Sequence, residues 1–171
     1  MAAVYEVHVF TGSGPTDATY TNGSRFHRAD TVVTTDGSTT FIPIPTSGTN
    51  YSYRRTFKLK VTTTPVGSVS NLRFFSDGSS WGTGITPYAK QKASYTQATS
   101  ADNTALFDGT AVDATTYTSG SPLTINASTV LSNPSTGYGT QDYLVMQVAV
   151  GTTAAAGTTA ARTLTFRVDE T

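Results

Sequence analysis

The chain has 171 residues, a length that suits one globular domain with its own core. Its 11 basic residues balance 11 acidic ones, so no long-range field draws the molecule toward nucleic acid or an anionic membrane surface. The chain has no cysteine, which excludes disulfides and thiolate metal sites, and no apolar run approaches the ~18 residues of a membrane-spanning helix.

Strand patterns begin at the N-terminus. Polar and apolar side chains alternate from Val4 to Phe10, which predicts a first strand. Residues 31–45 are interpreted as a hairpin, because Asp36-Gly37 suits the positive φ angles of a type I′ turn. Pro43 and Pro45 cannot donate to a ladder, so the second arm is an edge strand or leaves the sheet there.

The next strand, Tyr53 to Val61, carries a basic stripe in the sequence YRRTFKLKV. Alternation gives it one apolar face and one face with Arg54, Lys58 and Lys60. Arg55 falls on the apolar face. We therefore expect Arg55 near the strand end, with its stem packed and its guanidinium reaching polar partners.

The rest of the chain varies in the strength of its pattern. A strand is predicted within 70–78, with Leu72 and Phe74 pointing inward, and two strong strands at 142–150 and 162–168 close the chain. The stretch 96–141 has a weak pattern. Because a structureless stretch of that length is unusual in a compact domain, we expect short strands in it that the sequence does not locate.

These patterns predict an all-β fold without appreciable α-helix. Frequent turns and two layers of alternation indicate one antiparallel β-sandwich over residues 1–171, of jelly-roll or immunoglobulin-like type, with about nine or ten strands. The segment GTTAAAGTTAA, 151–161, is either a long hairpin tip or an arm that orders against a neighbouring chain. In the second case its candidate contacts are Thr152, Thr153, Thr158 and Thr159.

No set of residues is spaced for catalysis. The chain lacks a G-x-S-x-G elbow and phosphate-cradling motifs, and a serine triad would have only His8 and His27 as bases. We interpret His8 as a solvent-facing or cross-strand polar residue. A metal site from Glu6, both histidines and Asp30 would require the first strand to lie beside 25–30, which the spacing does not demand. We expect no enzyme, cofactor or metal.

One aromatic group offers a binding alternative. Trp81, Tyr88 and Tyr95 fall within one loop-and-strand segment, and aromatic rings on a β-sandwich loop can stack on sugar rings. A single Trp near strand ends also commonly packs beneath a loop, because its ring buries a large apolar area. Both interpretations stay open.

The basic stripe has three possible roles. A nucleic-acid surface requires a net basic domain with stacking aromatics beside the charges, whereas the net charge is zero and Phe57 lies on the face opposite Lys58 and Lys60. We favour a solvent-facing strand surface with charges paired to carboxylates such as Glu6 or Asp169. The remaining role is contact with an acidic neighbour in an assembly, through Arg54, Lys58 and Lys60.

The absence of cysteine, the loops rich in Ser, Thr, Ala and Gly, the early strand YRRTFKLKV and the terminal TLTFRVDE together resemble small β-sandwich virion proteins of tailed bacteriophages. Among these the chain is most similar to capsid decoration, or cement, proteins. The resemblance implies a dimer or trimer on the capsid surface, assembled in the host cytoplasm, that contacts the major capsid protein or other virion proteins and neither nucleic acid nor membrane. A tail- or fibre-associated host-recognition module that binds carbohydrate is the alternative.

Overall fold

The computed structural model describes residues 2–20, 25–32, 40–157 and 159–171. Within them it is all-β, with eleven strands, two short 3-10 helices and no α-helix, so no described helix could span a membrane. The predicted number of strands was nine or ten. The strands are β1 (Val4–Thr11), β2 (Thr16–Thr19), β3 (Thr49–Tyr51), β4 (Arg55–Thr63), β5 (Ser68–Ser76), β6 (Ile85–Lys92), β7 (Val112–Asp113), β8 (Leu123–Asn126), β9 (Leu131–Ser132), β10 (Tyr143–Gly151) and β11 (Leu164–Glu170); the helices are η1 (Ser100–Asn103) and η2 (Ala114–Thr116).

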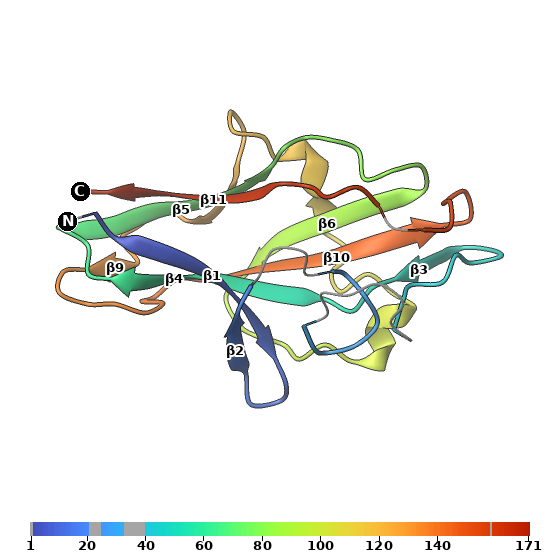
Figure 1. The fold of residues 1–171 in the computed structure, drawn as a ribbon, viewed down its shortest axis with the longest axis horizontal. Helices are drawn as coiled ribbons and strands as arrows, with labels where there is room; N and C mark the ends of the chain where they lie inside the picture. The colour runs from blue at the N-terminus through green and yellow to red at the C-terminus, as the bar shows by residue number, and fades with distance from the viewer. Residues whose placement is uncertain (1, 21–24, 33–39, 158) are drawn as a thin grey trace.

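Two antiparallel sheets pack face to face, which confirms the predicted sandwich (Figure 1). Sheet A has the order β2-β1-β4-β10-β6-β7, with β3 also paired to β10, and sheet B has the order β11-β5-β8, with β9 also paired to β5. From β4 onward the longer strands alternate between the sheets, β4, β6 and β10 in sheet A and β5, β8 and β11 in sheet B. Sheet neighbours therefore come from distant parts of the sequence.

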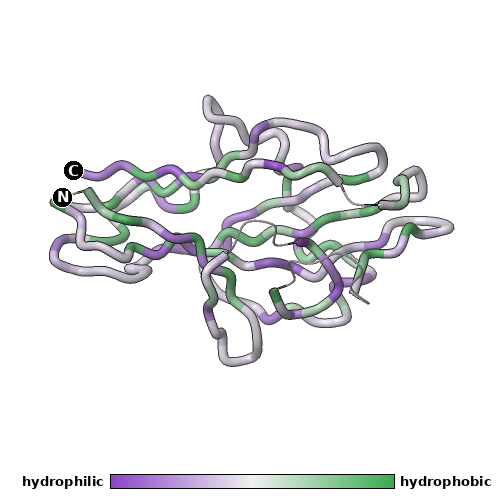
Figure 2. Tube along the Cα trace, in the orientation of Figure 1, coloured by the Kyte–Doolittle hydropathy of each residue, from purple (hydrophilic) through white to green (hydrophobic). Residues whose placement is uncertain are grey.

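The core lies between the sheets and takes one face of each central strand. Phe57 and Leu59 of β4, Leu72 and Phe74 of β5, and Met146 of β10 all belong to it. Leu72 and Phe74 point inward as predicted, and Phe74 has no exposed surface. Burial of each such side chain contributes about 1.5–3 kcal/mol. Figure 2 shows the alternation of hydrophobic and hydrophilic residues along the strands.

β10 is buried on both faces, unlike a strand with one wet side: every residue from Leu144 to Val150 is buried. The segment 94–108 covers its outer face. Gln147, fully buried there, accepts a hydrogen bond from the backbone N of Phe107 (2.7 Å) and donates to the carbonyl oxygens of Ser52 and Asp102 (2.7 and 3.1 Å). One buried amide thus fixes this segment to sheet A.

Three local predictions have different outcomes. The stretch 96–141 contains the short strands β7, β8 and β9, as expected. The turn at Asp36-Gly37 lies outside the described residues, and 41–45 forms no strand, consistent with its prolines. No strand was predicted between Phe10 and residue 31, but Thr16–Thr19 pairs with β1 as β2, and this hairpin projects from the sandwich in Figure 1.

Candidate functional site

The outer face of sheet A gathers side chains that sequence analysis treated separately. Because Phe57, Val9, Leu144 and Ala89 point into the core, their neighbours on β4, β1, β10 and β6 point outward. Two loop tyrosines pack on the same surface. We call this surface the aromatic–lysine face; its members are Phe10, Lys58, Lys60, Lys90, Lys92, Tyr95, Tyr138 and Tyr143.

Four aromatic rings form the centre of this face. The ring of Phe10 lies 5.3 Å from Tyr138, 5.5 Å from Tyr143 and 6.4 Å from Tyr95, and the first two contacts are edge-to-face. The Tyr95 hydroxyl donates to the carbonyl oxygen of Gly12 (2.9 Å). Burial, followed by the nearby Asp30 carboxylate, raises the pKa of Tyr95 to about 12, so this hydroxyl stays protonated. The hydrogen bond to Gly12 holds the Tyr95 ring in the cluster.

Lys58 joins this cluster directly. Its Nζ lies 4.0 Å from the ring centroid of Tyr143, a cation–π contact, and partial burial lowers the pKa of Lys58. Lys60 Nζ lies 5.6 Å from the ring centroid of Tyr138. The sequence argument that aromatic rings and basic charges occupy opposite faces is therefore wrong: it considered Phe57 of the same strand, whereas the rings come from other elements.

His8 anchors the β1–β2 side of the face. Its Nδ1 lies 2.8 Å from the Asp17 carboxylate and its Nε2 lies 3.2 Å from Glu6, while its ring meets Tyr138 edge-on at 5.8 Å. His8 was predicted to be either solvent-facing or a cross-strand polar residue. It is 4% exposed and buried by the β1–β2 hairpin, so the second prediction holds. The Tyr138 hydroxyl also donates to Asp17, and this bond is the first cause of the lowered pKa of that carboxyl.

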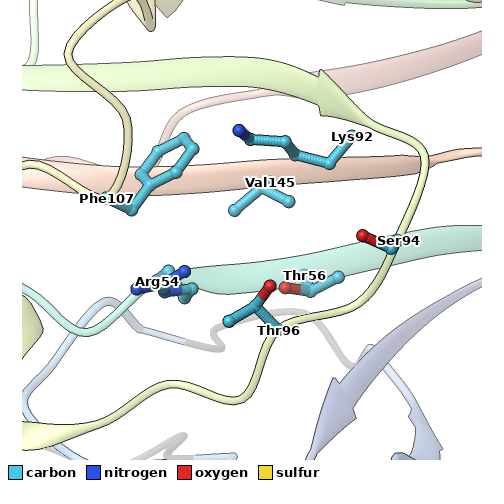
Figure 3. Close-up of a pocket in the computed structure, with 7 residues that line it drawn as sticks. All are labelled: Arg54, Thr56, Lys92, Ser94, Thr96, Phe107 and Val145. Atoms are coloured by element: carbon cyan, nitrogen blue, oxygen red, sulfur yellow. The ribbon is translucent and has the colours of Figure 1, made fainter.

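A hollow of about 110 Å³ lies beside the aromatic cluster, over the floor formed by Val145. Figure 3 shows side chains from β4, β6 and the covering segment around it. Its polar groups are three hydroxyls and two cationic side chains, and Phe107 forms an apolar wall. The lining residues are Arg54, Thr56, Lys92, Ser94, Thr96, Phe107 and Val145.

The cations of the hollow are paired with carboxylates. Arg54 Nη2 lies 2.6 Å from Asp102, whose side chain is 3% exposed, and Lys92 bonds to Asp108, which also lies 3.2 Å from Lys90 Nζ. Hydrogen bonds from Lys92 and then from Thr110 hold the pKa of Asp108 well below its usual range. Arg54 is thus largely buried in an internal ion pair.

The stripe also has different partners from those predicted. Lys60 Nζ lies 3.7 Å from Asp17, a residue of the hairpin that sequence analysis missed. Of the two predicted partners, Glu6 lies opposite Lys60 in the β1–β4 ladder, as the prediction requires. Asp169, the other predicted partner, belongs to β11 in the other sheet. The charges therefore pair locally, but mainly with aspartates that come from outside the neighbouring strands.

Arg55 behaves as predicted for a charged residue on an inward face. It is the first residue of β4, is 5% exposed, and donates from Nη2 to the carbonyl oxygen of Arg25 (3.3 Å) and to Nε2 of His27. Burial lowers the pKa of Arg55 to about 10 and, together with the Arg55 charge, that of His27 to about 4. His27 and His8 lie in separate clusters, and no group of three potential metal ligands assembles among the described residues.

The three aromatics proposed to stack on sugars do not come together. Trp81 precedes β6 and Tyr95 follows it, so a strand of about 23 Å separates them. The Trp81 ring packs edge-on against Phe26 at 5.7 Å. Tyr88, on β6, lies opposite Gln147 of β10 and Asp113 of β7, and Tyr95 belongs to the aromatic cluster. Trp81 therefore packs beneath a loop.

The Ala/Thr-rich segment 151–161 connects β10 to β11 across the two sheets. Thr152, Thr153 and Thr159 are exposed, and Thr158 lies outside the described residues. The segment is anchored at its start, where Gly151 N donates to the carbonyl oxygen of Gly84 (2.7 Å). Because β10 and β11 belong to different sheets, the segment is a crossover connection and not the tip of a hairpin, and its exposure in the single chain agrees with the arm hypothesis.

Comparisons with known proteins do not identify a relative. The chain matches no family model, no curated protein and no solved structure.

Proposed function

We propose that the protein is a non-enzymatic virion structural protein, a capsid decoration protein that stabilises a phage head through protein–protein contacts. The observation that carries the proposal is the aromatic–lysine face, where Phe10, Tyr95, Tyr138 and Tyr143 form a rigid centre and lysines surround it. Interfaces concentrate binding energy in such preorganised aromatic centres with polar rims. The resemblance to decoration proteins supports the same role.

The charges on this face favour a protein partner over a nucleic acid. Lys60, Lys90 and Lys92 each have an aspartate within 3.7 Å, so few positive charges remain to replace the counterions of a phosphate backbone. A surface of paired charges is suited to a protein partner that offers both signs. The expected partners are the major capsid protein or other virion proteins, with the decoration protein as a dimer or trimer on the capsid surface.

Co-sedimentation with purified phage heads tests the proposal. The wild-type protein should pellet with the heads, and the Lys58→Glu/Lys60→Glu variant should remain in the supernatant with an unchanged far-UV circular dichroism spectrum. Arg73→Glu, a charge reversal on β5 of the opposite sheet, is the control and should pellet normally. Undiminished pelleting of the double variant across a salt titration would refute the use of this face.

The second candidate is a carbohydrate-binding module of a tail or fibre. The hollow favours it, because the hydroxyls of Thr56, Ser94 and Thr96 surround a small space beside the Phe107 ring. Glycan-array binding that Phe107→Ala abolishes would support this candidate. Binding abolished by Trp81→Ala instead would move the site to the loop before β6, whereas pelleting with heads that free sugars leave unchanged would favour the decoration role.

A further inference from the structure

β11 is the open edge of sheet B. Among the described residues its only strand partner is β5, and none of its seven residues is buried, in contrast to β10. The inward-pointing Leu164, Phe166 and Val168 pack against the core yet remain partly exposed. An edge strand of this length presents unpaired backbone groups that favour addition of another strand.

The backbone bonds show which groups are unpaired. Thr171 exchanges both hydrogen bonds with Ser68, and Thr163 accepts from the backbone N of Asp77. Bonding alternates along an antiparallel ladder, so odd-numbered residues of β11 face β5, and Phe166 and Val168 direct their N–H and C=O groups to the open edge. The pairing of β11 with β5 shifts register opposite Val168. The extra residue belongs to β5, so the backbone of β11 stays regular.

β11 carries three charges: Arg167 and Asp169 flank Val168 on either side, and Glu170 accepts hydrogen bonds from the backbone N of Ala3 and of Val66. We infer that β11 pairs antiparallel with the β11 of a second copy about a twofold axis at Val168, which joins two sheets B into one continuous sheet. Each Arg167 then lies opposite the Asp169 of the other copy in a non-hydrogen-bonded pair, where side chains approach most closely. Thr165 lies opposite Thr171.

The competing twofold registers have no such charge match. Pairing about Arg167 would place the two Arg167 side chains opposite each other, which is unfavourable, and pairing about Phe166 would place Arg167 opposite Thr165. Neither charge has an ion-pair partner among the described residues: Arg167 has a 3.3 Å bond from Nη1 to the carbonyl oxygen of Ser119 and a 5.8 Å contact with the Phe75 ring, and Asp169 accepts from the amide of Asn71 (2.7 Å).

Exposed apolar residues flank the same end of the strand. Val66 donates its backbone N–H to the Glu170 carboxylate (3.2 Å), as does Ala3, the residue before Val4. Val4 is 51% and Val66 65% exposed. Both would lie beside the second copy, and the resulting interface is isologous, as twofold dimers require.

Sedimentation equilibrium of the purified chain tests the dimer. We expect a dimer at micromolar concentration, and about a tenfold or larger rise in its dissociation constant for Arg167→Asp, which places like charges opposite each other twice. The double variant Arg167→Asp/Asp169→Arg restores the pairs and should restore dimerisation. Circular dichroism verifies that each variant is folded.

Cysteine cross-linking tests the register independently, since the chain has no cysteine of its own. Val168→Cys should be captured as a dimer by a short bismaleimide, because the two Cα atoms would lie about 5.5 Å apart. Thr165→Cys is the matched control, with its two copies about 20 Å apart along the strands, and should not react. A wild-type monomer at all concentrations, no effect of Arg167→Asp, or equal cross-linking at both positions would overturn the inference. The proposed capsid role does not enter these assays, so the two proposals fail separately.

Discussion

Replacing Asp102 with Asn removes the negative charge of the Arg54–Asp102 pair while keeping the shape of the side chain. Asp102 is 2% exposed and accepts from Arg54 at Nε (3.0 Å), at Nη2 (2.6 Å) and at the backbone N (3.2 Å). Removing one partner of a buried ion pair costs about 3–5 kcal/mol. Since the Arg54 side chain is 19% exposed and partly hydrated, we expect a loss of about 2–3 kcal/mol, which lowers Tm by roughly 4–12 °C in a chain of this size.

A double-mutant cycle measures whether the cost belongs to the pair. Urea unfolding followed by the fluorescence of Trp81 would give the free energy of unfolding for Asp102→Asn, Arg54→Met and the double variant. The double variant should lose less stability than the sum of the single variants, with a coupling energy above about 1 kcal/mol. Additive losses, or a loss below about 1 kcal/mol for Asp102→Asn, would refute the view that this pair fixes the covering segment to sheet A.

Three further predictions concern other parts of the chain. The folded-state pKa of His27, about 4, lies below its unfolded value of 6.5. The contribution of neutral His27 to the free energy of unfolding is therefore fully present above pH 6.5 and falls by up to about 3 kcal/mol as the pH drops to 4. His27→Gln should flatten this pH dependence in urea titrations. Met146→Ala, at a position with no exposure, should cost about 2–5 kcal/mol in the same assay. Deletion of Thr152 to Ala160 should leave the thermal unfolding of the isolated chain nearly unchanged and weaken pelleting with heads, since Gly151 and Leu164, joined by Ala161 to Thr163, can still lie about 13 Å apart. An unfolded deletion variant would contradict the arm hypothesis.

The strong strands could be predicted because each carries its own pattern. In β4 and β5, alternation identified Phe57, Leu72 and Phe74 as inward residues, and all three are buried. The same reasoning identified Arg55 as a charge that must find polar partners inside, as it does in Arg25 and His27. These inferences depend only on the two faces of one strand, which sequence order determines.

The short elements could not be predicted in this way. β2 has four exposed residues, TDAT, with no apolar side to alternate, and it forms because its backbone completes the edge of β1. Without this hairpin the sequence left His8 either solvent-facing or in a cross-strand polar contact, and only the second holds. Its burial depends on Asp17 and Tyr138, which reach it from the hairpin and from a distant loop. Burial by residues from other parts of the sequence leaves no periodic pattern in the strand that is covered.

The role of the basic stripe shows why the candidate site required the strand order. Alternation alone places Phe10 on the strand face away from Val9, and Tyr143 on the strand face away from Leu144. The outward direction of both rings could therefore have been derived from the sequence. Their meeting at Lys58 could not, because β1, β4 and β10 are far apart in the sequence, and strands of the other sheet lie between β4 and β10 along the chain. A net charge of zero excludes a field over the whole molecule but not a local surface where lysines meet aromatic rings. The proposed attachment through this face would therefore depend on contacts over a few ångströms, and replacing Tyr143 should weaken it even at a salt concentration that screens the lysines.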